Sequence, residues 1–228
     1  MSPAQLPLDF DPRPALGGED FLVAPNNADA VAWLDRWPDW PAVVLAIHGP
    51  DGCGKTHLTQ VFLASSGAAA VDADTLAGTP APQVFGDAPA VVIDGADTML
   101  TGGLETPLFH LYNVAAETGR KILMTARSAP ARWEISLPDL RSRLSTAITA
   151  EIGLPDDPLI AALIVKLFAD RQLRVEDGVV NFLLPRLERS FAAVLKAVAA
   201  IDEAALAEQR RITVPLARRV LQEIQPEE

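Results

Sequence analysis

The sequence predicts an α/β fold in which a five-stranded parallel sheet is followed by a small all-helical lid. Apolar runs typical of fully buried strands alternate with helical patterns up to residue 153, and after that point only helical patterns follow. The chain has 228 residues and 49% hydrophobic content, which is enough to bury a good core without disulfides or metal ions. Strands that alternate with helices favour a doubly wound parallel sheet with right-handed crossovers.

The expected elements are short and are separated by glycine and proline. The strands cover residues 42–48, 69–72, 90–94, 121–125 and 147–152, and the helices between them cover residues 26–37, 57–65 and 105–118. The lid is expected to hold helices at residues 158–171, 177–187, 191–209 and 215–225. The sequence thus divides into a flexible tail at residues 1–18, an α/β domain at residues 19–154 and a helical lid at residues 155–228.

The composition argues against several classes of protein. The formal net charge of -11 opposes a surface that tracks nucleic-acid phosphates, so direct DNA binding is not expected. The single cysteine cannot close an internal disulfide and suits a reducing compartment, which indicates the cytoplasm. Because no apolar run is long enough to span a bilayer and the N-terminus lacks a signal-peptide pattern, we expect neither membrane anchoring nor export.

A glycine-rich segment follows the first long strand. It reads GPDGCGKT at residues 49–56, which is the Walker A pattern of P-loop proteins, and it lies between a predicted strand and a predicted helix. In this pattern backbone N–H groups cradle phosphates, the lysine reaches the outer phosphates and the hydroxyl ligates Mg²⁺. We expect the loop to bind ADP or ATP with Mg²⁺ through Gly49, Pro50, Asp51, Gly52, Cys53, Gly54, Lys55, Thr56 and His57. The alternative, an ordinary glycine turn, does not account for this context.

Asp94 ends the apolar run at residues 90–94, as the carboxylate of a Walker B strand does. A strand that ends in a solvated aspartate is the alternative interpretation, and the position of the run after the glycine-rich loop favours the functional one. Asp94 and Thr56 are therefore the expected protein groups at the Mg²⁺ ion that accompanies the nucleotide.

Five further segments resemble the DnaA/Hda family of AAA+ proteins. They are GKTHL at residues 54–58, FHLYN at 109–113, LPDLRSRL at 137–144, LLPRLER at 183–189 and QRRITVP at 209–215. The resemblance covers about residues 21–224. It implies a P-loop AAA+ core at residues 19–154 with the helical lid after it.

The resemblance assigns a role to one arginine. In this family the arginine of the Ser-Arg-Leu element is a finger that reaches the nucleotide held by a neighbouring molecule, and here that residue is Arg143. A guanidinium suits the task because it is always charged and bridges phosphate oxygens. Arg141 is the competing candidate, and without the resemblance either residue would be interpreted as a surface arginine.

The tail contains a second motif that the resemblance interprets. The segment Gln5-Leu6-Pro7-Leu8-Asp9-Phe10 resembles the peptide with which bacterial replication proteins bind the sliding clamp, the β subunit of the DNA polymerase. Gln5 would occupy a polar subsite while Leu8 and Phe10 fill an apolar pocket, with Leu6 in the same motif. A chance polar and apolar tail is the alternative.

Three positions depart from the family pattern. Gly95 stands where hydrolysing AAA+ proteins place a second acid, and Asp97 is out of register with that position. The sensor position after the fourth strand falls on Arg127, where an acid is usual, and the sensor arginine position of the lid falls on Ala192. We therefore expect the pocket to bind nucleotide but to hydrolyse it weakly or not at all.

Together these features imply a regulator of replication initiation. It would bind adenine nucleotide, dock on the sliding clamp and stimulate ATP hydrolysis by the initiator DnaA through Arg143 in trans. The alternatives are an autonomous AAA+ ATPase such as a helicase loader, and a clamp–initiator scaffold with a vestigial nucleotide site. Whether the protein forms a homodimer stays open at this point.

Overall fold

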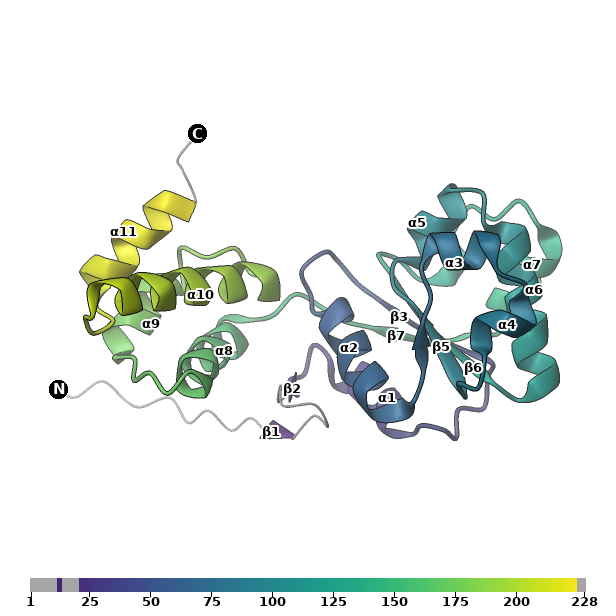
Figure 1. Ribbon diagram of the computed structural model, residues 1–228, viewed down its shortest axis with the longest axis horizontal. Helices are drawn as coiled ribbons and strands as arrows, with labels where there is room; N and C mark the ends of the chain where they lie inside the picture. The colour runs from purple at the N-terminus through teal and green to yellow at the C-terminus, as the bar shows by residue number, and fades with distance from the viewer. Residues whose placement is uncertain (1–11, 14–20, 225–228) are drawn as a thin grey trace. The chain divides into compact units, whose positions relative to one another are not determined.

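The computed structural model describes residues 12–13 and 21–224 (Figure 1). These residues form two compact units, Pro12–Gly153 and residues 154–224. A two-stranded antiparallel pair, β1 (Pro12–Arg13) and β2 (Phe21–Leu22), opens the first unit. The expected clamp motif, with Gln5, Leu6, Leu8 and Phe10, lies outside the described residues.

A five-stranded parallel sheet forms the centre of the first unit, which confirms the predicted fold class. Its strands are β3 (Val44–His48), β4 (Ala69–Ala70), β5 (Ala90–Ile93), β6 (Lys121–Ala126) and β7 (Ile148–Glu151). The order across the sheet is β4-β5-β6-β3-β7, and every neighbouring pair is parallel. The strand that precedes the glycine-rich loop, β3, therefore lies between β6 and β7.

The central strands β3 and β5 are apolar over nearly their whole length because helices cover both faces of the sheet. Successive side chains of a strand point to opposite faces. In β3, Val44 and Ala46 join one buried cluster while Leu45 and Ile47 join the other. This division explains why the strands read as continuous apolar runs instead of alternating patterns.

The helices of this unit divide between the two faces (Figure 1). Helices α1 (Ala28–Asp35) and α2 (Lys55–Ser66) cover one face, where Leu58 and Phe62 pack with Trp40. The other face is covered by α3 (Ala73–Gly78), α4 (Ala81–Phe85), α5 (Ala96–Thr101), α6 (Glu105–Thr118) and α7 (Pro138–Leu144), with a 3-10 turn at Pro130–Arg132.

Strands β3, β4, β5 and β7 are each one or two residues shorter than the sequence predicts, and β4 loses half of its expected length. The strand expected at residues 69–72 ends at Ala70, because Asp72 begins a helix instead. Its carboxylate accepts a hydrogen bond of 2.8 Å from the backbone N–H of Thr75 and so caps α3. Hydrogen bonding from Thr75 lowers the pKa of the Asp72 carboxyl group below its usual value.

The second unit holds four helices among its described residues. They are α8 (Asp157–Asp170), α9 (Asp177–Leu183), α10 (Phe191–Glu208) and α11 (Val214–Ile224). Asp156 and Ser190 cap α8 and α10, because their side-chain oxygens accept hydrogen bonds from the N–H groups of Leu159 and Ala193. The predicted helix at residues 177–187 ends early, before Pro185, which has no N–H to continue it. Within the described ranges, no helix is long and apolar enough to cross a membrane.

Candidate nucleotide-binding site

The glycine-rich loop connects the carboxyl end of β3 to the first residue of α2, Lys55. His48 at the end of β3 pairs with Ala126 of β6 on one side and with Glu151 of β7 on the other. The carboxyl edge of a parallel sheet is where α/β proteins bind ligands, and the free N–H groups of a helix N-terminus attract anions. The structure therefore places the loop where a phosphate site is expected.

Backbone conformation and packing both require glycine in this loop. Gly52 has φ 76° and Gly54 has φ 105°, which is the left-handed region where other residues are strained. At Gly49 the reason is space, because a Cβ atom there would lie 2.1 Å from the carbonyl oxygen of Ile152. Two of the three glycines thus set the path of the loop, and the third lets the residue that follows β7 pass close to it.

Lys55 turns its ammonium group onto the loop. Its Nζ donates hydrogen bonds of 2.8 Å to the carbonyl oxygens of Gly49 and Pro50, and it lies 3.8 Å from the Sγ atom of Cys53. Burial raises the pKa of the Cys53 thiol, so at neutral pH the sulfur is uncharged. Lys55 thus supplies a cation at the loop, and Cys53 packs beside it as a neutral side chain.

Thr56 and Asp94 meet although 38 residues separate them along the chain. The Thr56 hydroxyl, in the first turn of α2, donates a hydrogen bond of 2.8 Å to Oδ2 of Asp94, which follows β5. A hydroxyl and a carboxylate are hard oxygen ligands of the kind that Mg²⁺ takes. The pair fits the predicted role at a nucleotide-bound Mg²⁺ ion.

Thr125 is a residue of this site that sequence reasoning missed. It is fully buried in β6, and its hydroxyl donates a hydrogen bond to Oδ1 of Asp94 and accepts one of 3.0 Å from the N–H of Gly95. Each carboxylate oxygen of Asp94 therefore faces a different threonine hydroxyl. A polar residue within an apolar strand was the available signal, but its meaning depends on the pairing of β5 with β6.

The backbone at Gly95, the position where a second acid is expected in hydrolysing AAA+ proteins, suits glycine. Gly95 has φ 75°, a conformation that favours glycine and strains a glutamate or an aspartate. The next carboxylate in the chain, Asp97, accepts a hydrogen bond of 3.0 Å from the backbone N–H of Arg127. The Arg127 side chain in turn pairs with Asp51 of the loop, at 3.1 Å between Nε and Oδ1.

Arg141 and Arg143 lie in the last turn of α7, and both side chains are exposed. The guanidinium carbon of Arg143 lies 5.7 Å from the centre of the Tyr112 ring, which belongs to α6. Arg143 makes no side-chain hydrogen bond or ion pair within the described part of the chain. The structure therefore brings Arg143 together with Tyr112 and not with the loop. In the second unit, Ala192 is an exposed residue in the first turn of α10.

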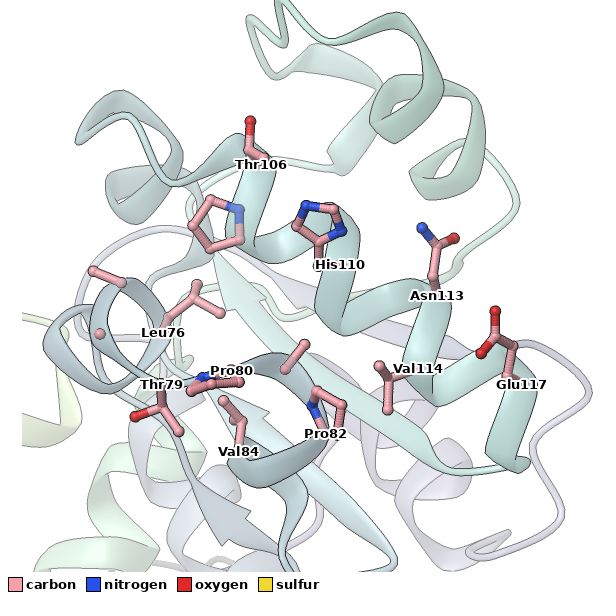
Figure 2. A pocket seen from close by; sticks show the side chains of 14 residues that line it. Leu76, Thr79, Pro80, Pro82, Val84, Thr106, His110, Asn113, Val114 and Glu117 are labelled. Atoms are coloured by element: carbon pink, nitrogen blue, oxygen red, sulfur yellow. The ribbon is translucent and has the colours of Figure 1, made fainter.

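A separate open cavity of about 680 Å³ lies between α3, α4 and α6 (Figure 2). His110, Asn113 and Glu117 of α6 stand along one side of it, and Pro80 and Pro82 lie across from them. None of the predicted site residues lines this cavity.

The parallel sheet, the glycine-rich loop and the four helices of the second unit give the chain the AAA+ fold, with a P-loop core and a helical lid. Domain III of the replication initiation protein DnaA from Thermotoga maritima superposes with a TM-score of 0.77 and 18% identity, over 95% of this chain and 100% of that one. AMPPCP-bound DnaA from Aquifex aeolicus gives a TM-score of 0.70 and 16% identity, over 94% and 71%. A mutant of Thermotoga maritima RuvB gives a TM-score of 0.61 and 16% identity, over 86% and 66%.

Residues 156–221 match the family model described as Hda, lid domain. A protein of Haemophilus influenzae described as uncharacterized is 28% identical over 188 residues, which is 77% of this chain and 80% of that protein. The lid match and the DnaA-like fold agree with each other. The second unit is similar to the Hda lid, and the chain as a whole has the fold of DnaA domain III.

Proposed function

We propose that this protein is a DnaA-related regulator of replication initiation that acts in the cytoplasm. It binds ADP or ATP with Mg²⁺, docks on the sliding clamp through residues 5–10 and stimulates ATP hydrolysis by DnaA with Arg143 in trans. The match of residues 156–221 to the Hda lid and the likeness to DnaA domain III support a role beside the initiator.

The geometry of the loop supports the nucleotide part of the proposal. Lys55 supplies a cation, α2 supplies free N–H groups, and Thr56 with Asp94 supplies oxygen ligands for Mg²⁺. One of the structures with the same fold is that of DnaA bound to AMPPCP, an analogue of ATP. We infer that the equivalent loop of this chain binds an adenine nucleotide.

The observation that supports the trans mechanism is a contrast within the first unit between the position after Asp94 and Arg143. The position after Asp94 has a left-handed backbone that favours glycine, so this pocket lacks a second acid to orient an attacking water. By contrast, Arg143 is exposed at the end of α7 and has no ion-pair partner within the described ranges. This combination suits a protein that completes the catalytic site of another molecule better than its own.

An ATP turnover assay separates this proposal from its alternatives. We expect slow hydrolysis by the protein alone, slow hydrolysis by DnaA alone, and fast hydrolysis when both are mixed with clamp loaded on DNA. Fast hydrolysis by the protein alone would identify an autonomous ATPase. Binding to both partners without faster hydrolysis would identify a scaffold.

A further inference from the structure

We propose that the ion pair between Arg127 and Asp51 balances the charge at the mouth of the loop. The loop can then bind a nucleoside triphosphate as well as a diphosphate. The inference rests on the proposed nucleotide binding and adds a specificity-determining pair to it. Neither residue is one of the three to which the phosphate and Mg²⁺ positions were assigned, Lys55, Thr56 and Asp94.

The strand order places the two residues together. Asp51 follows β3 by three residues, and Arg127 directly follows β6. Because β3 and β6 are neighbours, with His48 paired to Ala126, their carboxyl ends deliver both side chains to one edge of the sheet. The N–H of Gly49 also donates to the carbonyl oxygen of Ala126 at 3.1 Å, which ties the start of the loop to the end of β6.

Asp51 is an unfavourable residue in a phosphate cradle. The Lys55 ammonium donates to the carbonyl oxygens of Gly49 and Pro50. The lysine expected to bind the outer phosphates therefore contacts the residue directly before Asp51. A carboxylate at that point repels a polyphosphate. The repulsion grows with the number of phosphate groups, because ATP carries one more negative charge than ADP.

Arg127 cancels this charge without closing the loop. The pair is exposed, with side-chain exposures of 69% for Arg127 and 72% for Asp51, so it adds little to folding stability. Its backbone is fixed independently, because the Arg127 N–H donates to Asp97 at the start of α5. An arginine that is anchored at its backbone and paired at its side chain keeps a positive charge beside Asp51.

The test measures the affinity of the full chain for ADP and for AMPPCP, both with Mg²⁺, by titration calorimetry. Arg127→Ala should weaken AMPPCP binding relative to ADP binding by roughly three- to tenfold, because it leaves the Asp51 charge uncompensated. Asp51→Asn should shift the ratio in the opposite direction. The double variant should return the ratio close to that of the unchanged protein, and all shifts should shrink as salt rises.

Arg120→Ala is the matched control, since Arg120 directly precedes β6 and lies at the opposite end of the same strand. It removes the same charge and should leave the ratio unchanged. If Arg127→Ala leaves the ratio unchanged, or if Asp51→Asn does not rescue it, the charge-balance proposal is wrong; failed rescue would indicate direct contact between Arg127 and a phosphate. If the unchanged protein binds ADP but not AMPPCP, the charge-balance proposal is wrong, and if it binds neither nucleotide, the proposed function itself fails.

Discussion

Asp94 receives a separate hydrogen bond on each of its carboxylate oxygens, from Thr56 on one and from Thr125 on the other. The Thr125 hydroxyl is fully buried and also accepts the Gly95 N–H, so its position is fixed from two directions. A carboxylate held in this way is oriented before any ion arrives. Orientation of a metal-facing group by a neighbour is a common means of strengthening a metal site.

Thr125→Val keeps the shape of the residue and removes the hydroxyl. We expect the Mg²⁺-dependent part of ADP affinity to fall about tenfold, since loss of a partner that orients a metal ligand weakens metal binding by about that factor or more. We also expect stability to fall by about 1–3 kcal/mol, because the Gly95 N–H loses its acceptor. Calorimetry with Mg²⁺ and with EDTA measures the first effect, and thermal unfolding measures the second.

Thr125→Ser is the control for this substitution, because it restores the hydroxyl and loses only a methyl group. It should recover most of the Mg²⁺ dependence. Equal Mg²⁺ dependence in the valine variant and the unchanged protein would show that Thr125 has only a structural role.

Lys55→Ala removes the cation that the loop holds against its own carbonyl oxygens. We expect most nucleotide binding to be lost, because charge-assisted contacts to phosphate are the strongest that the loop offers. The fold should remain nearly intact, which circular dichroism would verify. Unchanged ADP affinity in a folded variant would mean that the loop is only structural.

At the scale of single elements, α7 carries the residue on which the trans mechanism depends. Arg141 and Arg143 are two positions apart in its last turn, so their side chains point to different sides of the helix. Only one of them can face the nucleotide of a docked partner. The structure distinguishes them further, because Arg143 is the one that lies over the Tyr112 ring.

Arg143→Ala should abolish stimulation of DnaA while leaving the fold, the bound nucleotide and the clamp contact intact. Arginine fingers supplied in trans are worth about 10³ to 10⁵ in rate, whereas a surface arginine changes stability by under about 0.5 kcal/mol. Arg143→Lys should fail nearly as badly, because an ammonium lacks the planar fork that bridges oxygens. The measurement is the rate of ATP hydrolysis by DnaA with loaded clamp.

Arg141→Ala is the comparison for that experiment and should stimulate normally. If it fails while Arg143→Ala stimulates, the assignment is wrong by two residues. If both variants stimulate normally, the finger mechanism must be replaced by the scaffold.

The elements that the sequence predicts well are those long enough to show a period. The helix expected at residues 105–118 is α6 at those bounds, and all five strands are present. Some helices are too short to show a helical period, with only five to seven residues: α3, α4, α5 and α7. Thr125 and the Arg127–Asp51 pair could not be predicted for another reason, since both depend on which strands are neighbours.

At the scale of the whole molecule, the proposed regulator has to reach a clamp loaded on DNA without binding the DNA itself. The net charge of -11 does not attract a phosphate backbone, so the clamp would have to supply the location. Among residues 12–13 and 21–224, which the structure describes, the buried hydrophobic side chains run from Leu22 to Leu221. The proposed clamp motif at residues 5–10 lies outside the described residues.

Changing Gln5, Leu8 and Phe10 together to alanine should therefore abolish clamp binding and leave the melting temperature unchanged. Clamp affinity by surface plasmon resonance and unfolding by calorimetry measure the two effects. A variant with Leu206→Ala, an exposed apolar residue at 78% exposure in α10, controls for general loss of surface hydrophobicity. Clamp binding that survives the triple change would move the contact to the folded part of the chain.

The contact between Arg143 and Tyr112 has a consequence for the speed of recognition. A free arginine side chain has about 2 kcal/mol of rotamer entropy to lose when a partner immobilises it. The Tyr112 ring is itself buried, at 6% exposure, and offers a rigid face that restricts the rotamers of Arg143 before a partner binds. If Arg143 acts on a partner as proposed, a buried tyrosine of one molecule helps to determine how readily that molecule engages another.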